Sequence, residues 1–331
     1  MMKIYKLIFF MALMSSTLIT ISSYSWIGMW IGLEINLLSI IPLMSNNFNF
    51  KTNESAIKYF ITQAIASFIF LWTIIIILNS FYYSYNLMMI MNSALFMKMG
   101  AAPFHFWIPS VMENLSWTNN FLLSTWQKIA PMIILSYNIQ PMYFFIIVIS
   151  CMLISGMLGI NQNSLKKILA FSSINHIGWL ICSMMFKMII WLIYLTIYSL
   201  ITFNIIFMFH SMNMTNMKHM YMWSNKNLYV KILFVMNFFS LAGLPPFLGF
   251  MPKWLTIKSL MENNYYFITL ICIIMTLIVI YYYIRISFST MIIKTNELNF
   301  NSLKINKMNL VTLNFMAITS LIFSTMMINY I

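Results

Sequence analysis

The segment Lys98-Met-Gly-Ala-Ala-Pro-Phe-His-Phe-Trp107-Ile-Pro109 interrupts an apolar run that extends from residue 84 to residue 115. An apolar helix of about 20 residues is long enough to cross the hydrocarbon core of a bilayer. Glycine and proline disturb the helical hydrogen bonds, and a break at membrane depth is tolerated where the freed backbone groups find other partners. We therefore predict a membrane-spanning helix that is broken near its middle.

A second copy of this pattern lies in the apolar run 228–262. Gly243-Leu-Pro-Pro246-Phe247 with Pro252 matches Gly100-Ala-Ala-Pro103-Phe104 with Pro109 in the form G-x-x-P-F-x-x-x-x-P. The two runs are the fourth and ninth predicted spans, so an odd separation makes them cross the membrane in opposite directions. In transporters, such an inverted repeat places discontinuous helices and ion sites near the bilayer midplane. From the pattern alone, the alternative that glycine and proline only kink two helices stays open.

The composition of the whole chain is that of an integral membrane protein. Of its 331 residues, 62% are hydrophobic and 7% are charged, whereas a soluble domain carries about 25% charged residues. We predict an all-α polytopic helix bundle with about eleven spans, as a single transmembrane domain over 1–331. Residues 84–211 are expected to form the core of the first repeat, and 228–330 part of the second, inverted repeat. The predicted spans are 4–22, 25–44, 56–79, 84–115, 118–138, 141–161, 167–185, 188–211, 228–262, 265–289 and 309–330.

The distribution of lysines predicts the orientation of the chain. A net charge of +13 suggests nucleic acid binding in a soluble protein, but here the lysines lie in short connections between apolar runs. Lysine in short loops marks the side from which a membrane protein is inserted. The loops on the side opposite the N-terminus hold only Lys187, with Lys258 on a half-helix. The lysines on the N-terminal side are Lys3, Lys6, Lys51, Lys58, Lys166, Lys167, Lys218, Lys226, Lys231, Lys294, Lys304 and Lys307.

Four ionisable residues are predicted at membrane depth: Glu34, Lys98, Lys128 and Lys253. A charge at the centre of a spanning helix costs roughly 2.5–3.5 kcal/mol on insertion scales. Lysines near helix ends can extend to the headgroups, but Lys128 lies about ten residues, or roughly 15 Å of helix, from either end of its span. We expect Glu34 to pair with Lys98, which leaves the other two lysines for another role. Ionisable groups within a membrane indicate an ion or proton path.

Helix ends and histidines add to this prediction. Lys98 ends a half-helix, where the helix dipole favours a cation, whereas Lys253 begins one, where the dipole disfavours it. His176 lies in Ser172-Ser-Ile-Asn-His176, whose hydroxyl and amide groups can hold water. For this histidine a packing role and a proton-relay role stay equally open. His105 lies in the first break and gives a weaker signal of the same kind.

Several kinds of site are absent from the sequence. It contains no G-x-G-x-x-G motif, no Walker sequence and no spacing of ligands that suits a metal. Cys151, Cys182 and Cys272 lie far apart within apolar runs, which is typical of small buried hydrophobic residues and not of iron–sulfur ligands. Nucleotide, flavin and iron–sulfur chemistry is therefore expected on other chains.

Four segments resemble the motifs of the antiporter-like subunits of respiratory complex I, the proton-pumping NADH:ubiquinone oxidoreductase. They are the two broken spans that carry Lys98 and Lys253, the segment Ser124-Thr-Trp-Gln-Lys128-Ile-Ala-Pro131, and Ser172-Ser-Ile-Asn-His176. They follow the family's order along most of the chain. Bacterial members have fourteen spans in two inverted five-helix repeats. Eleven spans, with Glu34 already in the second, are similar to the short form of animal mitochondria, which lacks the first three. The 34 methionines also suit a mitochondrial coding sequence.

The resemblance implies a function for each of these residues. Glu34, Lys98, Lys128 and Lys253 correspond to the family's key glutamate and lysines on a central hydrophilic axis, and His176 to its link between half-channels. Distant quinone reduction then drives proton translocation across the mitochondrial inner membrane, with the N-terminus in the matrix and the C-terminus in the intermembrane space. NADH, FMN, iron–sulfur clusters and ubiquinone are expected on other subunits, and no cofactor on this chain. The expected partners are other membrane-arm subunits, neighbouring antiporter-like subunits, accessory subunits and lipids, but no nucleic acid.

Three other functions are alternatives to this one. A stand-alone cation/proton antiporter uses the same buried lysines without an electron-transfer partner, but the methionine bias and the short N-terminus argue against it. A purely structural membrane scaffold has no need of charges at the midplane. A quinone-binding enzyme is disfavoured because no His/Tyr/Asp cluster faces a plausible headgroup pocket.

Overall fold

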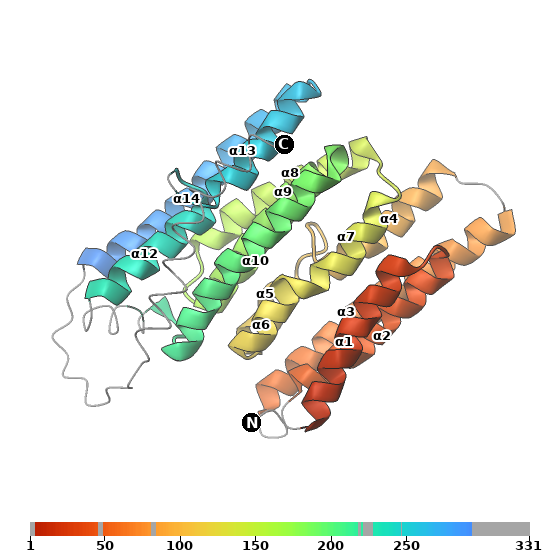
Figure 1. Ribbon diagram of the computed structural model, residues 1–331, viewed down its shortest axis with the longest axis horizontal. Coiled ribbons are helices and arrows are strands. Elements are labelled where there is room, and N and C mark those ends of the chain that lie inside the picture. The colour runs from red at the N-terminus through yellow and green to blue at the C-terminus, as the bar shows by residue number, and fades with distance from the viewer. Residues whose placement is uncertain are drawn as a thin grey trace. The chain divides into compact units, whose positions relative to one another are not determined.

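The computed structural model of the chain is helical throughout the part that it describes (Figure 1). It describes residues 4–45, 49–80, 84–217, 220, 228–245 and 247–292. In these residues, the only β-type pairing is an isolated bridge between Ser164 and Asn216. The chain divides into two compact units, Met1–Cys151 and Met152–Ile331, with the boundary inside one helix. This confirms the predicted all-α fold class.

The first unit contains the helices up to the boundary. Its elements are α1 (Ile4–Ser22), α2 (Trp26–Met44), α3 (Phe50–Ser80), α4 (Tyr85–Met99), α5 (Trp107–Asn114), α6 (Trp117–Ser124), the 3-10 turn η1 (Trp126–Lys128), α7 (Ile129–Ser136) and the beginning of α8 (Pro141–Ile160). In Figure 1, α1, α2 and α3 lie side by side in red to orange. Helix α4 packs on both α3 and α7, and the short helix α5 also packs on α3.

The second unit contains the end of α8 and the helices that follow it. These are α9 (Leu165–Phe186), α10 (Met188–Ser211), α12 (Leu228–Ala242), α13 (Phe250–Glu262) and α14 (Tyr266–Ile292). Helix α9 packs on α10 and α13, and α12 packs on α10 and α14. The pair α12 and α14 is visible in teal and blue in Figure 1.

The observed helices agree with the predicted spans at most positions. Runs 84–115 and 228–262 are each split into two helices, as their glycines and prolines predicted. Run 118–138 was expected to be continuous, but it is divided into α6, η1 and α7. The last predicted span, 309–330, lies outside the described residues, so the count of eleven and the limits of the repeats stay predictions.

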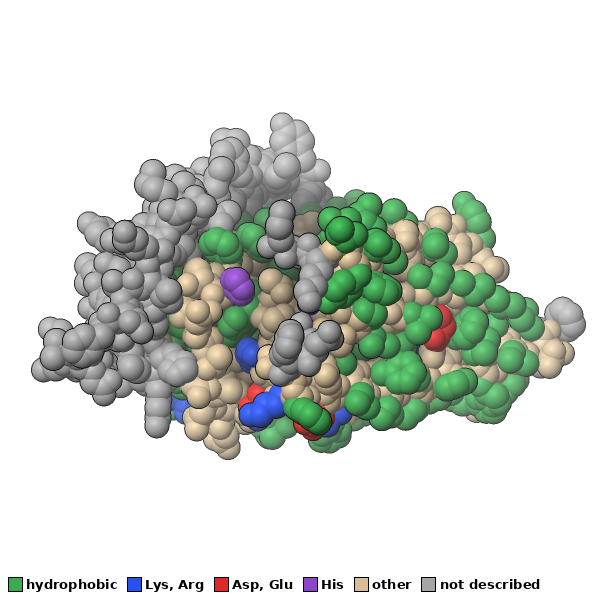
Figure 2. All heavy atoms as spheres, turned by 90° about the horizontal axis from the view of Figure 1, so that it is seen from below, with side chains coloured by type: hydrophobic (Ala, Val, Ile, Leu, Met, Phe, Trp, Pro, Cys, Tyr) green, Lys and Arg blue, Asp and Glu red, His purple; other side chains and the backbone are tan. Residues whose placement is uncertain are grey.

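The helices have the composition and the surface of membrane spans. Seven helices among the described residues are long and apolar enough to cross a bilayer. Large hydrophobic side chains such as Phe68, Trp72 and Ile146 are exposed on their outer faces. Figure 2 shows one face on which hydrophobic side chains cover much of the described surface and charged ones are few. Buried serine and threonine hydroxyls in these helices donate to carbonyls of their own preceding turn, as Thr20 does to Thr17 at 2.7 Å, so they need no water.

Candidate functional site

The two helix breaks have the same backbone construction. Gly100 and Gly243 both adopt left-handed conformations, with φ of 71° and 78°, which glycine reaches without steric cost. The residue after each glycine bonds back to the helix, Ala101 to Phe96 at 3.0 Å and Leu244 to Phe239 at 3.2 Å. Two further backbone bonds, from Phe104 to Ala101 and from Phe247 to Leu244, are both 2.8 Å long. The sequence repeat is therefore also a structural repeat.

Side chains satisfy the backbone groups that the first break sets free. Trp107 Nε1 donates to the carbonyl of Met97 at 3.1 Å, and Gln63 Nε2 donates to that of Lys98 at 3.2 Å. On the other side of the break, Ser150 Oγ donates to the carbonyl of Ala102 at 2.8 Å. Each bond removes an unpaired acceptor that would be costly in an apolar environment. The break is thus held by α3, α5 and α8.

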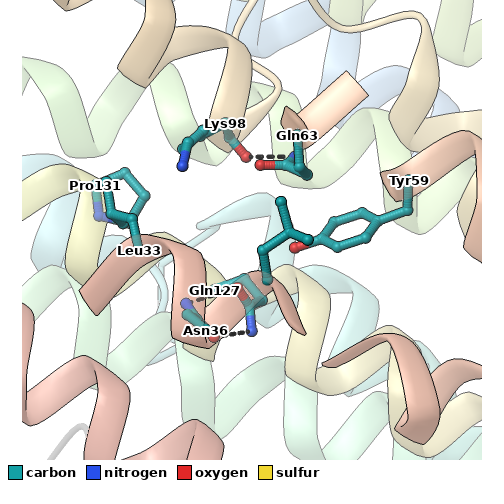
Figure 3. Close-up of a pocket in the computed structure, with 8 residues that line it drawn as sticks. Leu33, Asn36, Tyr59, Gln63, Lys98, Gln127 and Pro131 are labelled. Carbon is teal, nitrogen blue, oxygen red and sulfur yellow. Dashed lines mark hydrogen bonds between the residues drawn. The ribbon is translucent and has the colours of Figure 1, made fainter. Parts of the chain in front are cut away.

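Lys98 lies in the last turn of α4 and is only 7% exposed. Together with Gln63 and Tyr59 of α3, it lines a small polar pocket with room for about one water molecule (Figure 3). Figure 3 shows Lys98 and Gln63 on one side of this pocket, and Asn36 with Gln127 on the other. The carbonyl end of α4 favours a positive charge at this position.

Glu34 and Lys98 interact without a direct ion pair. Their charges lie close enough for an electrostatic interaction, but the salt bridges among the described residues join other pairs. The Oε1 atom of Glu34 is buried and has no hydrogen-bond partner in the described part of the chain. The expected pairing is therefore present as an interaction through space, and the two groups are not in contact.

Lys128 ends the unpredicted 3-10 turn η1 and is 2% exposed. Pro131 explains the turn: it lacks an N–H, and its ring clashes with the carbonyl of Gln127, four residues earlier, in a regular helix. The backbone instead tightens, and the N–H of Lys128 bonds to Thr125 at 3.3 Å. Lys128 also lies close enough to Cys151 for the two groups to interact electrostatically. Like Lys98, which ends α4, Lys128 is thus located at an interruption of a helix.

Two amide side chains join this turn to the helix that carries Glu34. Asn36 Nδ2 donates to Gln127 Oε1 at 3.0 Å, and Gln127 Nε2 donates to Asn36 Oδ1 at 2.9 Å. Neither residue is among the predicted site residues, although polar amides near membrane depth are a signal that the sequence contains.

Lys253 is buried in the second unit, in the first turn of α13. Its Nζ reaches back across the break and donates to the carbonyl of Ala242 at 2.6 Å. Ala242 ends α12, so the ammonium lies at the negative end of a helix dipole. Lys253 thus begins a half-helix, as predicted, but its side chain is long enough to place the charge away from its own helix start and at the carbonyl end of another helix.

His176 lies on α9 and is 5% exposed. Its Nδ1 is 2.9 Å from the hydroxyl of Tyr194 on α10, and its ring packs on that of Tyr198 with a centroid distance of 4.7 Å. The adjacent Asn175 is 1% exposed, and neither of its amide atoms has a hydrogen-bond partner among the described residues. The two tyrosines were not predicted, because their role depends on how α10 packs.

His105 has a local role in the first break. Its Nδ1 lies 3.2 Å from the carbonyl of Pro103, and its ring lies 4.4 Å from that of Phe106. The structure therefore places this residue with Lys98 in the same unit, close to its own backbone turn. Among the residues described, no group of three or more His, Cys, Asp or Glu gathers as for a metal ion.

In chemical terms, these sites are suited to proton transfer. A lysine amine can accept a proton and release it, and burial disfavours its charged form unless carbonyl dipoles or a carboxylate compensate. Lys98 and Lys253 have such carbonyl ends nearby, and Lys98 also has Glu34. The imidazole of His176 adds a group that both accepts and donates protons.

Comparison with known proteins gave consistent similarities. Residues 23–279 match the family described as NADH:quinone oxidoreductase/Mrp antiporter, transmembrane. The chain is 46% identical to NADH-ubiquinone oxidoreductase chain 2 of Anopheles gambiae, over 98% of both chains. It is also 46% identical to the protein of the same name from Aedes aegypti, again over 98% of both chains. A chain in the structure of respiratory complex I from Thermus thermophilus with bound aureothin has a similar fold, with a TM-score of 0.84 and 18% identity, covering 96% of this chain and 78% of that one.

Proposed function

This chain belongs to the NADH:quinone oxidoreductase/Mrp antiporter family of transmembrane proteins, and from this premise we propose that it moves protons across a membrane. It acts as an antiporter-like membrane-arm subunit of a proton-pumping NADH:ubiquinone oxidoreductase. The relatives that are 46% identical over nearly the whole chain are named as chains of this enzyme. That level of similarity favours the oxidoreductase subunit over a stand-alone antiporter.

One observation carries the proposal. The three lysines predicted at membrane depth are all buried at interruptions of helices: Lys98 before the first break, Lys128 in the 3-10 turn and Lys253 after the second break. Burying a lysine is costly. A residue that served only for packing would have no reason to coincide with the unpaired carbonyl groups at a helix break. The placement is the one expected for groups that change protonation state during turnover. Glu34, His176 and His105 are proposed to assist them.

We further propose that the membrane is the mitochondrial inner membrane, with the N-terminus in the matrix and the C-terminus in the intermembrane space. The names of the relatives support the choice of membrane, and the lysine asymmetry supports the orientation. The two lysines assigned to the opposite side, Lys187 and Lys258, lie 3.6 and 3.9 Å from Glu262. That side therefore carries less net positive charge than its lysine count suggests.

The redox chemistry is proposed to occur on other subunits. The sequence holds no nucleotide or iron–sulfur motif, so NADH, FMN, iron–sulfur clusters and ubiquinone are assigned to partners. The proposed partners are other membrane-arm subunits, among them further antiporter-like ones, together with accessory subunits and lipids. The exposed apolar helix faces suit both lipid and such neighbours.

The test is Lys128→Met in the assembled enzyme. This change keeps the length and apolar character of the side chain and removes the titratable group. Inner-membrane vesicles that carry the variant are assayed for proton pumping and NADH–ubiquinone turnover, with assembly measured on native gels. We expect assembled enzyme with strongly impaired pumping. Normal pumping by the assembled variant would indicate that the chain has only a structural role. Pumping that persists without NADH turnover would favour the stand-alone antiporter.

A further inference from the structure

We propose that the reciprocal amide pair formed by Asn36 and Gln127 positions Lys128 for proton transfer. The inference rests on the function proposed above and assigns a role to two residues that neither titrate nor lie on the expected list of charges. Gln127 directly precedes Lys128, and Asn36 lies two residues after Glu34 on α2. The pair therefore links the segment that carries the lysine to the helix that carries the glutamate.

The turn at Lys128 needs an external support. Pro131 prevents a regular helix from forming across Gln127, so the backbone of η1 has fewer bonds of its own than a helix has. Both amide groups of the pair donate and accept, over 3.0 and 2.9 Å. Two parallel hydrogen bonds between planar amides restrict rotation as well as distance, and a single bond does not. The pair thus fixes the direction in which η1 presents the next side chain.

The surroundings of the pair support the same role. Asn36 is only 4% exposed, so its amide is poorly solvated and the bonds to Gln127 replace those to water. Asn36 and Gln127 line the pocket that Lys98 and Gln63 face from the other side (Figure 3). The amide pair therefore forms part of the pocket wall, and one of its members, Gln127, is the chain neighbour of Lys128. A change in the pair alters the placement of Lys128 relative to Glu34 and Lys98.

A second bond between the same two spans provides a matched control. Asn119 Nδ2 on α6 donates to the carbonyl of Leu43 on α2 at 2.9 Å. This bond also joins α2 to the fifth span, but near the end of both, away from the turn. If the Asn36–Gln127 pair only fastens two helices together, loss of the Asn119 bond has the same consequence. If the pair positions Lys128, loss of the Asn119 bond is far less harmful.

The experiment compares five variants in inner-membrane vesicles: Gln127→Leu, Asn119→Leu, Asn36→Gln, Gln127→Asn and the double variant Asn36→Gln/Gln127→Asn. The double variant exchanges the two amides and conserves their summed length, so the reciprocal bonds can form again. The single variants Asn36→Gln and Gln127→Asn lengthen or shorten one of the two side chains and keep an amide at both positions. They therefore remain informative if the leucine variants do not assemble. Proton pumping and NADH–ubiquinone turnover are measured per assembled complex, beside Lys128→Met.

We expect Gln127→Leu, Asn36→Gln and Gln127→Asn to lower coupled turnover by about tenfold, because small misplacements of reacting groups cost one to two orders of magnitude in rate. The double exchange restores most of the activity, and Asn119→Leu retains it. The inference is overturned if the double exchange is no better than its components, if Asn119→Leu is equally impaired, or if all amide variants pump normally. If Lys128→Met fails to pump and the amide variants pump normally, only this inference is overturned. If Lys128→Met pumps normally, the proposed function is overturned as well.

Discussion

Lys253 donates a hydrogen bond from Nζ to the carbonyl of Ala242 at 2.6 Å, across the second helix break. Lys98, in the first break, occurs before the glycine of its motif, whereas Lys253 occurs after the last proline of its own. Both are nevertheless associated with the carbonyl end of a half-helix, α4 or α12. In each repeat, a lysine is therefore associated with the carbonyl end of a half-helix. The lysine precedes the backbone turn in the first repeat and follows the equivalent turn in the second.

Gly243→Ala is expected to disturb Lys253. A Cβ at position 243 lies 2.8 Å from Cδ of Lys253, so the lysine side chain has to move. The left-handed φ of 78° adds about 1–2 kcal/mol of strain for a residue with a Cβ. Because a lysine side chain is flexible, we expect the complex to assemble and coupled turnover to fall by about tenfold. Turnover per assembled complex is the measurement, and Gly156→Ala is the control, since its Cβ meets Ile278 at an ordinary 3.5 Å. Equal activity of the two variants contradicts the prediction.

Gly100→Ala is expected to affect assembly more than Gly243→Ala does. The added Cβ overlaps the side chain of Ile108, which is 1% exposed and packed inside the first unit. Overpacking costs about 1–3 kcal/mol, in addition to about 1–2 kcal/mol for the left-handed backbone. We expect a marked loss of assembled complex on native gels and a lower thermal midpoint. The double variant Gly100→Ala/Ile108→Ala should recover part of the loss, and no recovery would contradict the overlap with Ile108 as its main cause.

Tyr194→Phe tests whether His176 is a proton relay or a packing residue. The change removes the hydroxyl that lies 2.9 Å from Nδ1 and leaves the ring in place. A hydrogen bond contributes about 1 kcal/mol net, so we expect coupled turnover to fall about fivefold with normal assembly. His176→Gln should be impaired more severely. Tyr281→Phe, at an exposed tyrosine, serves as the control. Normal turnover in both His176→Gln and Tyr194→Phe would assign the histidine to packing.

Glu262→Gln is expected to have little effect. Its ion pairs with Lys187 and Lys258 are about half exposed, and exposed pairs contribute about 0–1 kcal/mol. We expect the thermal midpoint and the turnover of the complex to stay close to those of the unchanged enzyme. A large loss of turnover would show that Glu262 takes part in proton release or in a contact with a partner subunit.

The break at Lys128 has a local signal in the sequence. Pro131 lies in the quoted segment, and a proline three residues after a buried lysine predicts that the helix is interrupted near that lysine. The apolar length of run 118–138 nevertheless predicts a single continuous span. Length alone was a weaker guide than the position of one proline.

By itself, the sequence determined the helical class, most helix limits and the two glycine–proline breaks. These features depend on interactions between residues close together in the chain: apolar length, the absence of an N–H in proline, and the freedom of glycine at positive φ. Only the tertiary structure decided that Asn36 meets Gln127, that His176 meets Tyr194, and that Glu34 and Lys98 interact without contact. Those relationships join residues on different helices, and they depend on how the helices pack and how far each long side chain extends.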